Sequence, residues 1–145
     1  MPSEKIAIAC DHAGYDLKAQ LAEDLVALNF EVVDLGANNG SDSVDYPDFA
    51  DAMAEAVRSG QVSRGVLVCG SGIGISIAAN RHKELRAALV GDVLAAQMSR
   101  LHNDANVIVF GGRMVGHAQA QECLKTFLQT EFEGGRHQRR VAKMT

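Results

Sequence analysis

The segment VLVCGSGIGISIAAN, residues 66–80, places a single thiol directly before a loop of alternating glycines. Cys69 ends a short apolar run, and Gly70, Gly72 and Gly74 follow it at every second position. Glycines let a ligand approach the backbone closely, and consecutive N–H groups that lead into a helix attract anions. The same field favours the thiolate form of a nearby cysteine. The pattern therefore indicates either a thiolate base or nucleophile beside an oxyanion site, or a buried structural cysteine before a tight turn.

The spacing of these glycines excludes three known types of phosphate-binding loop. A dinucleotide-binding loop needs Gly-x-Gly-x-x-Gly, but Ile75 stands where the third glycine belongs. A nucleoside-triphosphate loop ends in Gly-Lys-Ser/Thr, whereas the first lysine after Cys69 is Lys83. A cysteine phosphatase loop needs an arginine at its end, and the loop has none. We therefore expect none of these three chemistries.

Two further pairs of polar residues have types suited to substrate contact. Asp11 and His12, in CDHAG, directly follow a short apolar run. His102 and Asn103, in SRLHNDAN, end a helical pattern, and a helix C-terminus favours an imidazolium. The alternative for each pair is local: Asp11 and Asn103 cap helices, and His12 is a surface residue.

Three arginines are candidates for binding an anionic group. Arg136 and Arg140, in GGRHQRR, are spaced i and i+4, which places them on one face of a helix, and Arg113 follows an apolar run in FGGRMVG. Guanidinium groups suit a phosphate dianion. The alternative for Arg136 and Arg140 is that they belong to a solvated basic tail. Tyr46, in DYPD, either walls the site or contributes to packing.

Apolar runs that alternate with helical patterns predict the elements that position these residues. Their succession predicts β-α-β units, which close right-handed into a parallel sheet with helices on both faces. Ligands of such sheets bind outside the carboxyl ends of the strands. The predicted strands are residues 6–10, 31–35, 66–69, 86–90 and 106–110, the predicted helices are 17–28, 49–57, 75–79, 94–101 and 120–128, and 36–47 is the longest loop.

Composition narrows the class of protein. The 145 residues favour one domain, 1–145, with residues 134–145 as a basic C-terminal tail after a glycine hinge. A net charge of −4 does not suggest a nucleic-acid partner, and no apolar run is long enough to predict a membrane span. Three cysteines without a Cys-x-x-Cys pair fit a reducing cytoplasm. No two of the five histidines have a ligand spacing, so we expect no metal site.

Five motifs together resemble a family of sugar-phosphate isomerases. CDHAG, DYPDFA, VCGSGIGISIAAN, SRLHNDANVIVFGGR and EGGRHQRR are similar, in order and spacing, to ribose-5-phosphate isomerase B, whose family also contains the galactose-6-phosphate isomerase subunits. The resemblance covers nearly the whole chain. It implies a Rossmann-like three-layer α/β/α sandwich with a five-stranded parallel sheet. It also implies a homodimer or homotetramer that interconverts D-ribose 5-phosphate and D-ribulose 5-phosphate without a metal or organic cofactor.

The same resemblance implies a role for each candidate residue. Cys69 would be the base that moves a proton between C2 and C1, and His102 would open the furanose ring. The residues that would bind substrate are Asp11, His12, Asn103 and the anion hole Gly70, Ser71, Gly72, Ile73 and Gly74, with Arg113, Arg136 and Arg140 on the phosphate. Ser71 replaces the threonine of many members but keeps the hydroxyl. The site would lie between subunits, so that the tail reaches a partner chain.

Two other functions compete with this interpretation. One is isomerisation of a six-carbon sugar phosphate, such as allose or galactose 6-phosphate, which the sequence does not separate from the five-carbon reaction. The other is a non-catalytic module that binds sugar phosphates on the same fold. Cys69 and His102 argue against the second, because binding alone needs neither a thiolate nor an imidazole.

Overall fold

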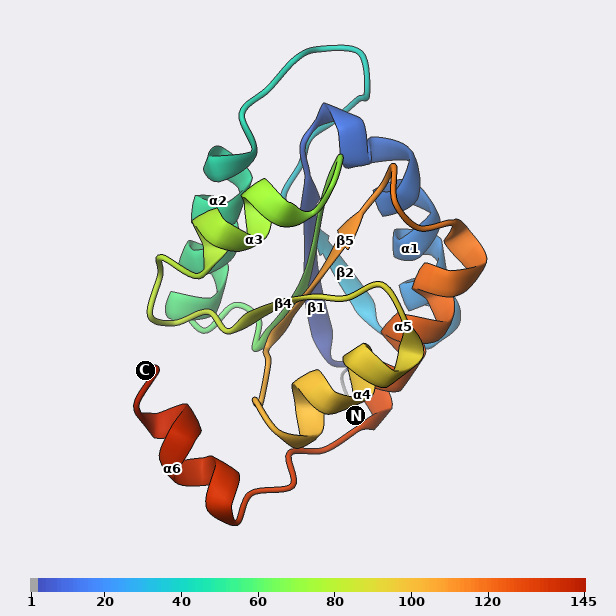
Figure 1. The fold of residues 1–145 in the computed structure, drawn as a ribbon. Helices are drawn as coiled ribbons and strands as arrows, with labels where there is room; N and C mark the ends of the chain where they lie inside the picture. Colours follow the sequence, from blue (N-terminus) through green and yellow to red (C-terminus); the bar gives the residue numbers. More distant parts are fainter. Residues whose placement is uncertain (1–2) are drawn as a thin grey trace.

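The computed structural model describes residues 3–145, which form a five-stranded parallel sheet between two layers of helices (Figure 1). The strand order is β2-β1-β3-β5-β4. The strands are β1 (Lys5–Cys10), β2 (Glu31–Asp34), β3 (Arg64–Cys69), β4 (Ala87–Leu89) and β5 (Val107–Gly111). The helices are α1 (Tyr15–Ala27), α2 (Tyr46–Arg58), α3 (Ile73–Ala79), α4 (Val93–Leu101), α5 (His117–Gln129) and α6 (Arg136–Ala142), with a 3-10 turn at His12–Gly14. The predicted three-layer α/β/α fold is confirmed.

The order of the strands fixes where a ligand would bind. From β1 the chain moves outward to β2 and then returns to β3 on the other side of β1. The carboxyl ends of β1 and β3 therefore flank a reversal of direction, which is where sheets of this kind form their ligand crevice. Asp11 follows β1, and Cys69 ends β3. The predicted strands thus lead both residues to the crevice.

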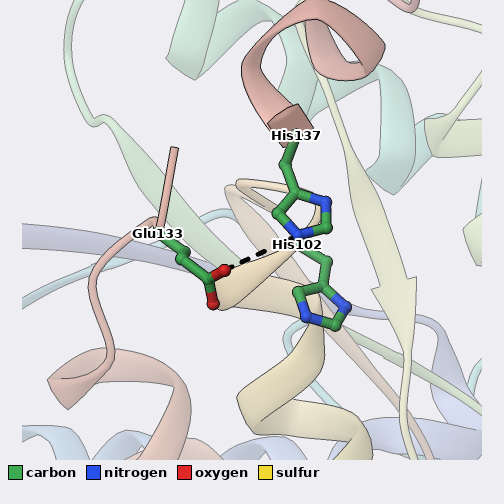
Figure 2. A group of neighbouring side chains, drawn as sticks. All are labelled: His102, Glu133 and His137. Carbon is green, nitrogen blue, oxygen red and sulfur yellow. Dashed lines mark ion pairs between the residues drawn. The ribbon is translucent and has the colours of Figure 1, made fainter. Parts of the chain in front are cut away.

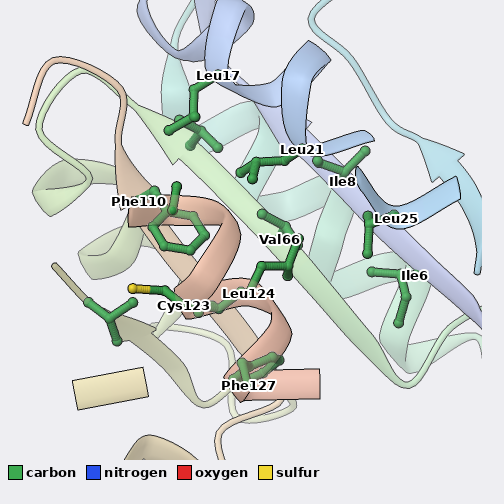
Figure 3. Close-up of a cluster of buried hydrophobic side chains, with 14 of the residues drawn as sticks. Ile6, Ile8, Leu17, Leu21, Leu25, Val66, Phe110, Cys123, Leu124 and Phe127 are labelled. Carbon is green, nitrogen blue, oxygen red and sulfur yellow. The ribbon is translucent and has the colours of Figure 1, made fainter. Parts of the chain in front are cut away.

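Two apolar clusters hold the helices on the sheet, one on each face. Leu21 and Leu25 of α1 and Phe127 of α5 are buried against Ile8 and Phe110 on one face (Figure 3). Residues of α2 and α3 cover the opposite face, and the Cys69 side chain belongs to this second cluster. Truncating one of these large buried side chains to alanine removes about 2–5 kcal/mol of stability. The clusters therefore fix the strand ends that carry the polar residues.

The structure corrects the boundary of the long loop. The predicted loop 36–47 ends earlier, because α2 begins at Tyr46. Pro47 lies in the first turn of α2, where its missing N–H costs nothing and its fixed φ suits a helix. The C-terminal tail forms the helix α6 after Gly134 and Gly135, whose φ angles of 72° and 59° lie in the left-handed region. None of the helices within residues 3–145 is long and apolar enough to cross a membrane.

Candidate active site

Cys69 lies at the carboxyl edge of the sheet, as predicted. It is the last residue of β3 and pairs in register with Gly111, the last residue of β5. Its carbonyl accepts a hydrogen bond of 2.8 Å from the N–H of Gly112, and the whole residue is only 4% exposed. The thiol is therefore held by the sheet itself, with the glycine loop directly after it.

The turn from β3 into α3 requires glycine at two positions. Gly72 has φ +78°, and a Cβ there would lie 2.5 Å from a methyl of Leu89 and 2.9 Å from the carbonyl carbon of Phe110. A Cβ on Gly74 would lie 2.5 Å from the ring of Tyr46. Side chains at these positions would push the turn away from the sheet. The alternating glycines thus let the loop lie flat against β5 and α2.

The loop presents backbone donors that have no partner. The N–H of Ile73 donates to the hydroxyl of Ser71 at 3.2 Å. No oxygen of residues 3–145 accepts from the N–H groups of Ser71, Gly72 and Gly74. Unpaired donors at the edge of a sheet are available to an oxyanion. The geometry therefore suits the predicted anion hole.

Asp11 and His12 lie beside this loop. The N–H of Asp11 donates to the carbonyl of Val68 at 3.2 Å, and its carboxylate accepts from the N–H of Gly14 at 3.1 Å. Nδ1 of His12 accepts from the backbone N–H of Val44 at 3.2 Å. Because this bond needs a lone pair on Nδ1, the neutral ring carries its proton on Nε2. Asp11 therefore does cap the following turn, and His12 has one donor left for a ligand.

Tyr46 and Arg113 complete the carboxyl-edge group. The ring of Tyr46 packs against Gly74 and, with Asp11 and His12, lines a cavity of about 550 Å³. The N–H of Arg113 donates to the carbonyl of Gly70 at 2.9 Å, and its guanidinium lies beside that glycine. Tyr46 thus serves both suggested roles, as wall and as packing. Arg113 brings a positive charge to the glycine loop, where it was expected.

His102 and Asn103 lie at the opposite edge of the sheet. His102 is the C-cap of α4, and its N–H donates to the carbonyl of Met98 at 2.9 Å. A helix that precedes a parallel strand ends at the amino edge, so both residues come before β5. A strand rises about 3.3 Å per residue, which separates the two ends of Val107–Gly111 by about 13 Å. These two candidates therefore lie away from the carboxyl edge, and His102 and Cys69 of one chain do not meet.

Helix α6 lies at the same edge as His102 (Figure 1). The rings of His137 and His102 are stacked, with centroids 4.3 Å apart and planes inclined by 18° (Figure 2). Arg136 and Arg140 belong to the same short helix and so lie at this amino edge, not beside Arg113. The site residues thus form two groups. The carboxyl-edge group holds Asp11, His12, Cys69, residues 70–74 and Arg113, and the amino-edge group holds His102, Asn103, Arg136 and Arg140.

His137 is a residue that the sequence interpretation missed. It is 5% exposed, and its Nε2 has no hydrogen-bond partner within residues 3–145. Burial lowers the pKa of His137, and the neighbouring charges of His102 and Arg136 lower it further. The signal in the sequence is the i, i+4 pair of His137 and Val141, both of which face inward on α6.

The structure also brings together a group able to hold a metal ion. His102, Glu133 and His137 each direct one ligand atom into a region in which these atoms lie within 4.8 Å of one another (Figure 2). The expectation of no metal site rested on spacing within the sequence. Spacing between histidines does not detect this group, because His102 ends α4, far in the sequence from Glu133 and His137, which are spaced i, i+4.

Exposed apolar side chains border the carboxyl-edge group. Ile73 and Ile77 project from α3 with about half or more of each residue exposed, and Met114 is 70% exposed. Leu89, which ends β4, and Val93 and Leu94, which begin α4, are also exposed apolar residues after or at the carboxyl end of a strand. Gathered apolar side chains of this kind mark contacts with another protein surface.

Comparison with known proteins identifies the family. The model of the ribose/galactose isomerase family matches residues 6–144. The chain is 45% identical to ribose-5-phosphate isomerase B of Escherichia coli, over 98% of this chain and 95% of the relative. The solved ribose 5-phosphate isomerase of Thermotoga maritima superposes with a TM-score of 0.94 at 44% identity, covering 97% of each chain. That of Mycoplasma genitalium, with bound ribulose-5-phosphate, has a TM-score of 0.92 at 41% identity, covering 99% of this chain and 95% of its own. With both groups of polar residues inside the matched range, this chain belongs to the ribose/galactose isomerase family and is an isomerase.

Proposed function

We propose that this isomerase interconverts D-ribose 5-phosphate and D-ribulose 5-phosphate through an enediolate. The observation that carries the proposal is the buried thiol of Cys69 beside a loop with unpaired N–H donors. Aldose–ketose exchange needs a base next to a site for the oxyanion that the base creates. The E. coli relative carries the name of this reaction, and the M. genitalium relative binds its ketose product.

The proposed steps use both groups of residues. The imidazole of His102 takes the proton of the anomeric hydroxyl and supplies a proton to the ring oxygen, which opens the furanose. The thiolate of Cys69 then removes the proton from C2, and the negative charge that forms on O1 is stabilised by the N–H groups of Ser71, Gly72 and Gly74. The same thiol returns the proton to C1, while the O2 proton passes to O1, and this gives the ketose. No redox partner is needed, because the electron pair stays within the sugar.

The arginines bind the phosphate in this proposal. Arg113 approaches from the carboxyl edge, and Arg136 and Arg140 approach from α6. Guanidinium groups form paired hydrogen bonds to phosphate oxygens, which fixes the small sugar at its far end. Binding energy from this non-reacting end orients C1 and C2 against Cys69.

The proposed site is shared between two chains, because neither chain holds both groups at one edge. A two-fold dimer places the carboxyl edge of one chain against the amino edge of its partner, and it does so twice. The apolar surface of Ile73, Ile77 and Met114 lies beside the carboxyl-edge group, where such an interface would form. The tail 134–145, which carries α6, then reaches the partner's site. A homodimer is the smallest assembly that completes the site, and a homotetramer contains the same pair.

We also propose that the enzyme works in the cytoplasm. Cys10, Cys69 and Cys123 form no disulfide with one another. The mechanism needs the thiol of Cys69 in its reduced form, which a reducing compartment maintains.

The second candidate is a six-carbon substrate, which the description of the family model favours because it names galactose beside ribose. An assay of purified protein on ribose 5-phosphate, beside allose 6-phosphate and galactose 6-phosphate, separates the two functions. We expect the highest kcat/KM on ribose 5-phosphate. A higher kcat/KM on a six-carbon sugar would replace the five-carbon assignment.

The same assay tests the base. Cys69→Ala should lower kcat by about 10²–10⁴-fold, because the general base is lost. Cys10→Ala is the matched control, since it removes a buried thiol at the end of the adjacent strand β1, on the other face of the sheet. We expect Cys10→Ala to keep most of the activity. Turnover near the wild-type value in folded Cys69→Ala protein would refute the assignment of the base.

A further inference from the structure

Three side chains at the amino edge have the donor types of a transition-metal site. His102 and His137 offer imidazole nitrogens, and Glu133 offers a carboxylate oxygen (Figure 2). We infer that His102, Glu133 and His137 bind a divalent transition-metal ion such as Zn²⁺, and that the bound ion inhibits the isomerase. The inhibition rests on the proposed function of His102, whereas the binding of the ion does not.

The donor set selects the class of ion. Two imidazoles and one carboxylate are three ligands of the kind that Zn²⁺ takes, with a fourth position left for water. Mg²⁺ and Ca²⁺ prefer oxygen ligands, which two imidazoles do not supply. We therefore expect Zn²⁺ and Co²⁺ to bind, and Mg²⁺ to compete poorly.

The buried nitrogen of His137 is the observation that points to a ligand. His137 is 5% exposed, and its Nε2 finds no hydrogen-bond partner within residues 3–145. The nearest carboxylate oxygen, Oε1 of Glu133, is 3.8 Å away, which is too far for a hydrogen bond. Buried polar atoms are rarely left unpaired, because they have lost their water without gaining a partner. An ion between the two histidines and the carboxylate would give Nε2 its partner.

The side chains must shift slightly to bind the ion. Zinc–nitrogen bonds are about 2.0–2.1 Å long, so tetrahedral ligand atoms lie roughly 3.4 Å apart. The present separations are at most 4.8 Å, and the ring of His102 must turn out of the stack so that the lone pairs converge. Glu133 is exposed and His102 is half-buried, so both have room to turn while His137 stays fixed. The charges of Arg136 and Arg140 nearby oppose a cation, and we therefore expect weaker binding than at a preformed structural zinc site.

Inhibition is expected because the metal ion and the sugar proton compete for the same lone pair of His102. An imidazole nitrogen of His102 that binds a metal ion is no longer available to accept a proton from the sugar. The ion also lies where the sugar would meet His102. We therefore expect Zn²⁺ to raise the apparent KM for ribose 5-phosphate more than it lowers kcat.

Calorimetric titration of the full chain with ZnCl₂ tests the site without reference to activity. We expect one ion per chain and an absorption spectrum of four-coordinate Co²⁺ when cobalt replaces zinc. Glu133→Gln and His137→Gln should each weaken binding by about tenfold or more, since even indirect partners of a metal ligand contribute that much. Glu133 is exposed, so its variant keeps the test valid if His137→Gln disturbs α6.

Two control variants identify other sites for the ion. His82→Gln removes a histidine that pairs with Asp51 elsewhere on the surface, and it should leave binding unchanged. Cys69→Ala should also leave binding unchanged. Loss of binding in Cys69→Ala, or unchanged binding in both Glu133→Gln and His137→Gln, would overturn the site.

Activity measurements distinguish the binding of Zn²⁺ from the inhibition that it is expected to cause. Glu133→Gln should keep the basal turnover of ribose 5-phosphate. The Zn²⁺ concentration that inhibits this variant should rise by the same factor by which its affinity for Zn²⁺ falls. If Zn²⁺ binds with the expected ligands but does not inhibit the wild-type enzyme, the inhibitory role is wrong and the site stands. If the protein turns over no ribose 5-phosphate, the proposed function is wrong, and so is the proposed inhibition. The calorimetric result then decides by itself whether the metal site exists.

Discussion

Mixing two inactive variants tests the shared site directly. A Cys69→Ala dimer lacks the base at both sites, and a His102→Asn dimer lacks the ring-opening group at both sites. Each dimer alone should retain about 1% of wild-type activity or less on cyclic ribose 5-phosphate, as expected for loss of an acid–base group. Activity that exceeds both values can come only from mixed dimers.

The expected magnitude follows from the two edges of the sheet. The ends of β5 are about 13 Å apart, so Cys69 and His102 of one chain cannot act on adjacent atoms of one sugar. In a mixed dimer one site combines both altered residues, and the other combines both intact ones. Equal amounts of two freely exchanging chains give half mixed dimers, each with one of two sites intact, and therefore about a quarter of wild-type activity.

The assay needs proof that the chains exchange. The two variants carry different affinity tags, are mixed, are dissociated in mild denaturant and are refolded, and the doubly tagged dimers are then isolated and counted. Mixing Cys69→Ala with Asp11→Asn is the matched control, because both residues lie at the carboxyl edge and no mixed dimer then holds an intact site. Doubly tagged Cys69→Ala/His102→Asn dimers without activity would refute the shared site. Activity in the Asp11→Asn mixture above that of either variant alone would refute it too.

Three further predictions follow from the described contacts. Iodoacetamide should alkylate Cys69 well before Cys10, because burial raises the pKa of the Cys10 thiol to about 11. Mapping by mass spectrometry should also show that substrate protects Cys69, and equal rates at the two cysteines would contradict this reasoning. Arg140→Ala should raise KM for ribose 5-phosphate about ten- to a hundredfold, since a charge-assisted contact contributes about 1.5–3 kcal/mol. The control Arg139→Ala, at the adjacent position, should change KM little. Equal effects of the two substitutions would contradict the phosphate contact of Arg140. Burial lowers the pKa of His137, so folded protein binds fewer protons than unfolded protein, and the docking of α6 should weaken as the pH falls below the ordinary value of 6.5. Proteolysis at Gly134–Gly135 should therefore be faster at acidic pH, and His137→Gln, which does not titrate, should remove that dependence.

Local patterns in the sequence predict the strands, most helices and the residues that gather at the carboxyl edge. Apolar runs and helical spacing are local properties, and the parallel arrangement follows from their alternation. Once the strands are parallel, residues that follow them must meet at one edge, which is why Asp11, Cys69 and Arg113 were predicted together. The glycines after Cys69 carried their own signal, because only a close approach of the backbone requires them at that spacing.

The position of the amino-edge group depends on contacts between distant segments. His102 precedes a strand and therefore lies at the amino edge, and α6 returns from the end of the chain to stack His137 on it. Nothing in the local spacing relates His102 to Glu133 or His137, since a contact between distant segments depends on the path of the whole chain. The same holds for Tyr46, whose ring against Gly74 depends on how α2 packs beside α3. Local residue patterns fix the elements and the edge that each strand end reaches, whereas contacts between edges and helices arise only when the complete core has packed.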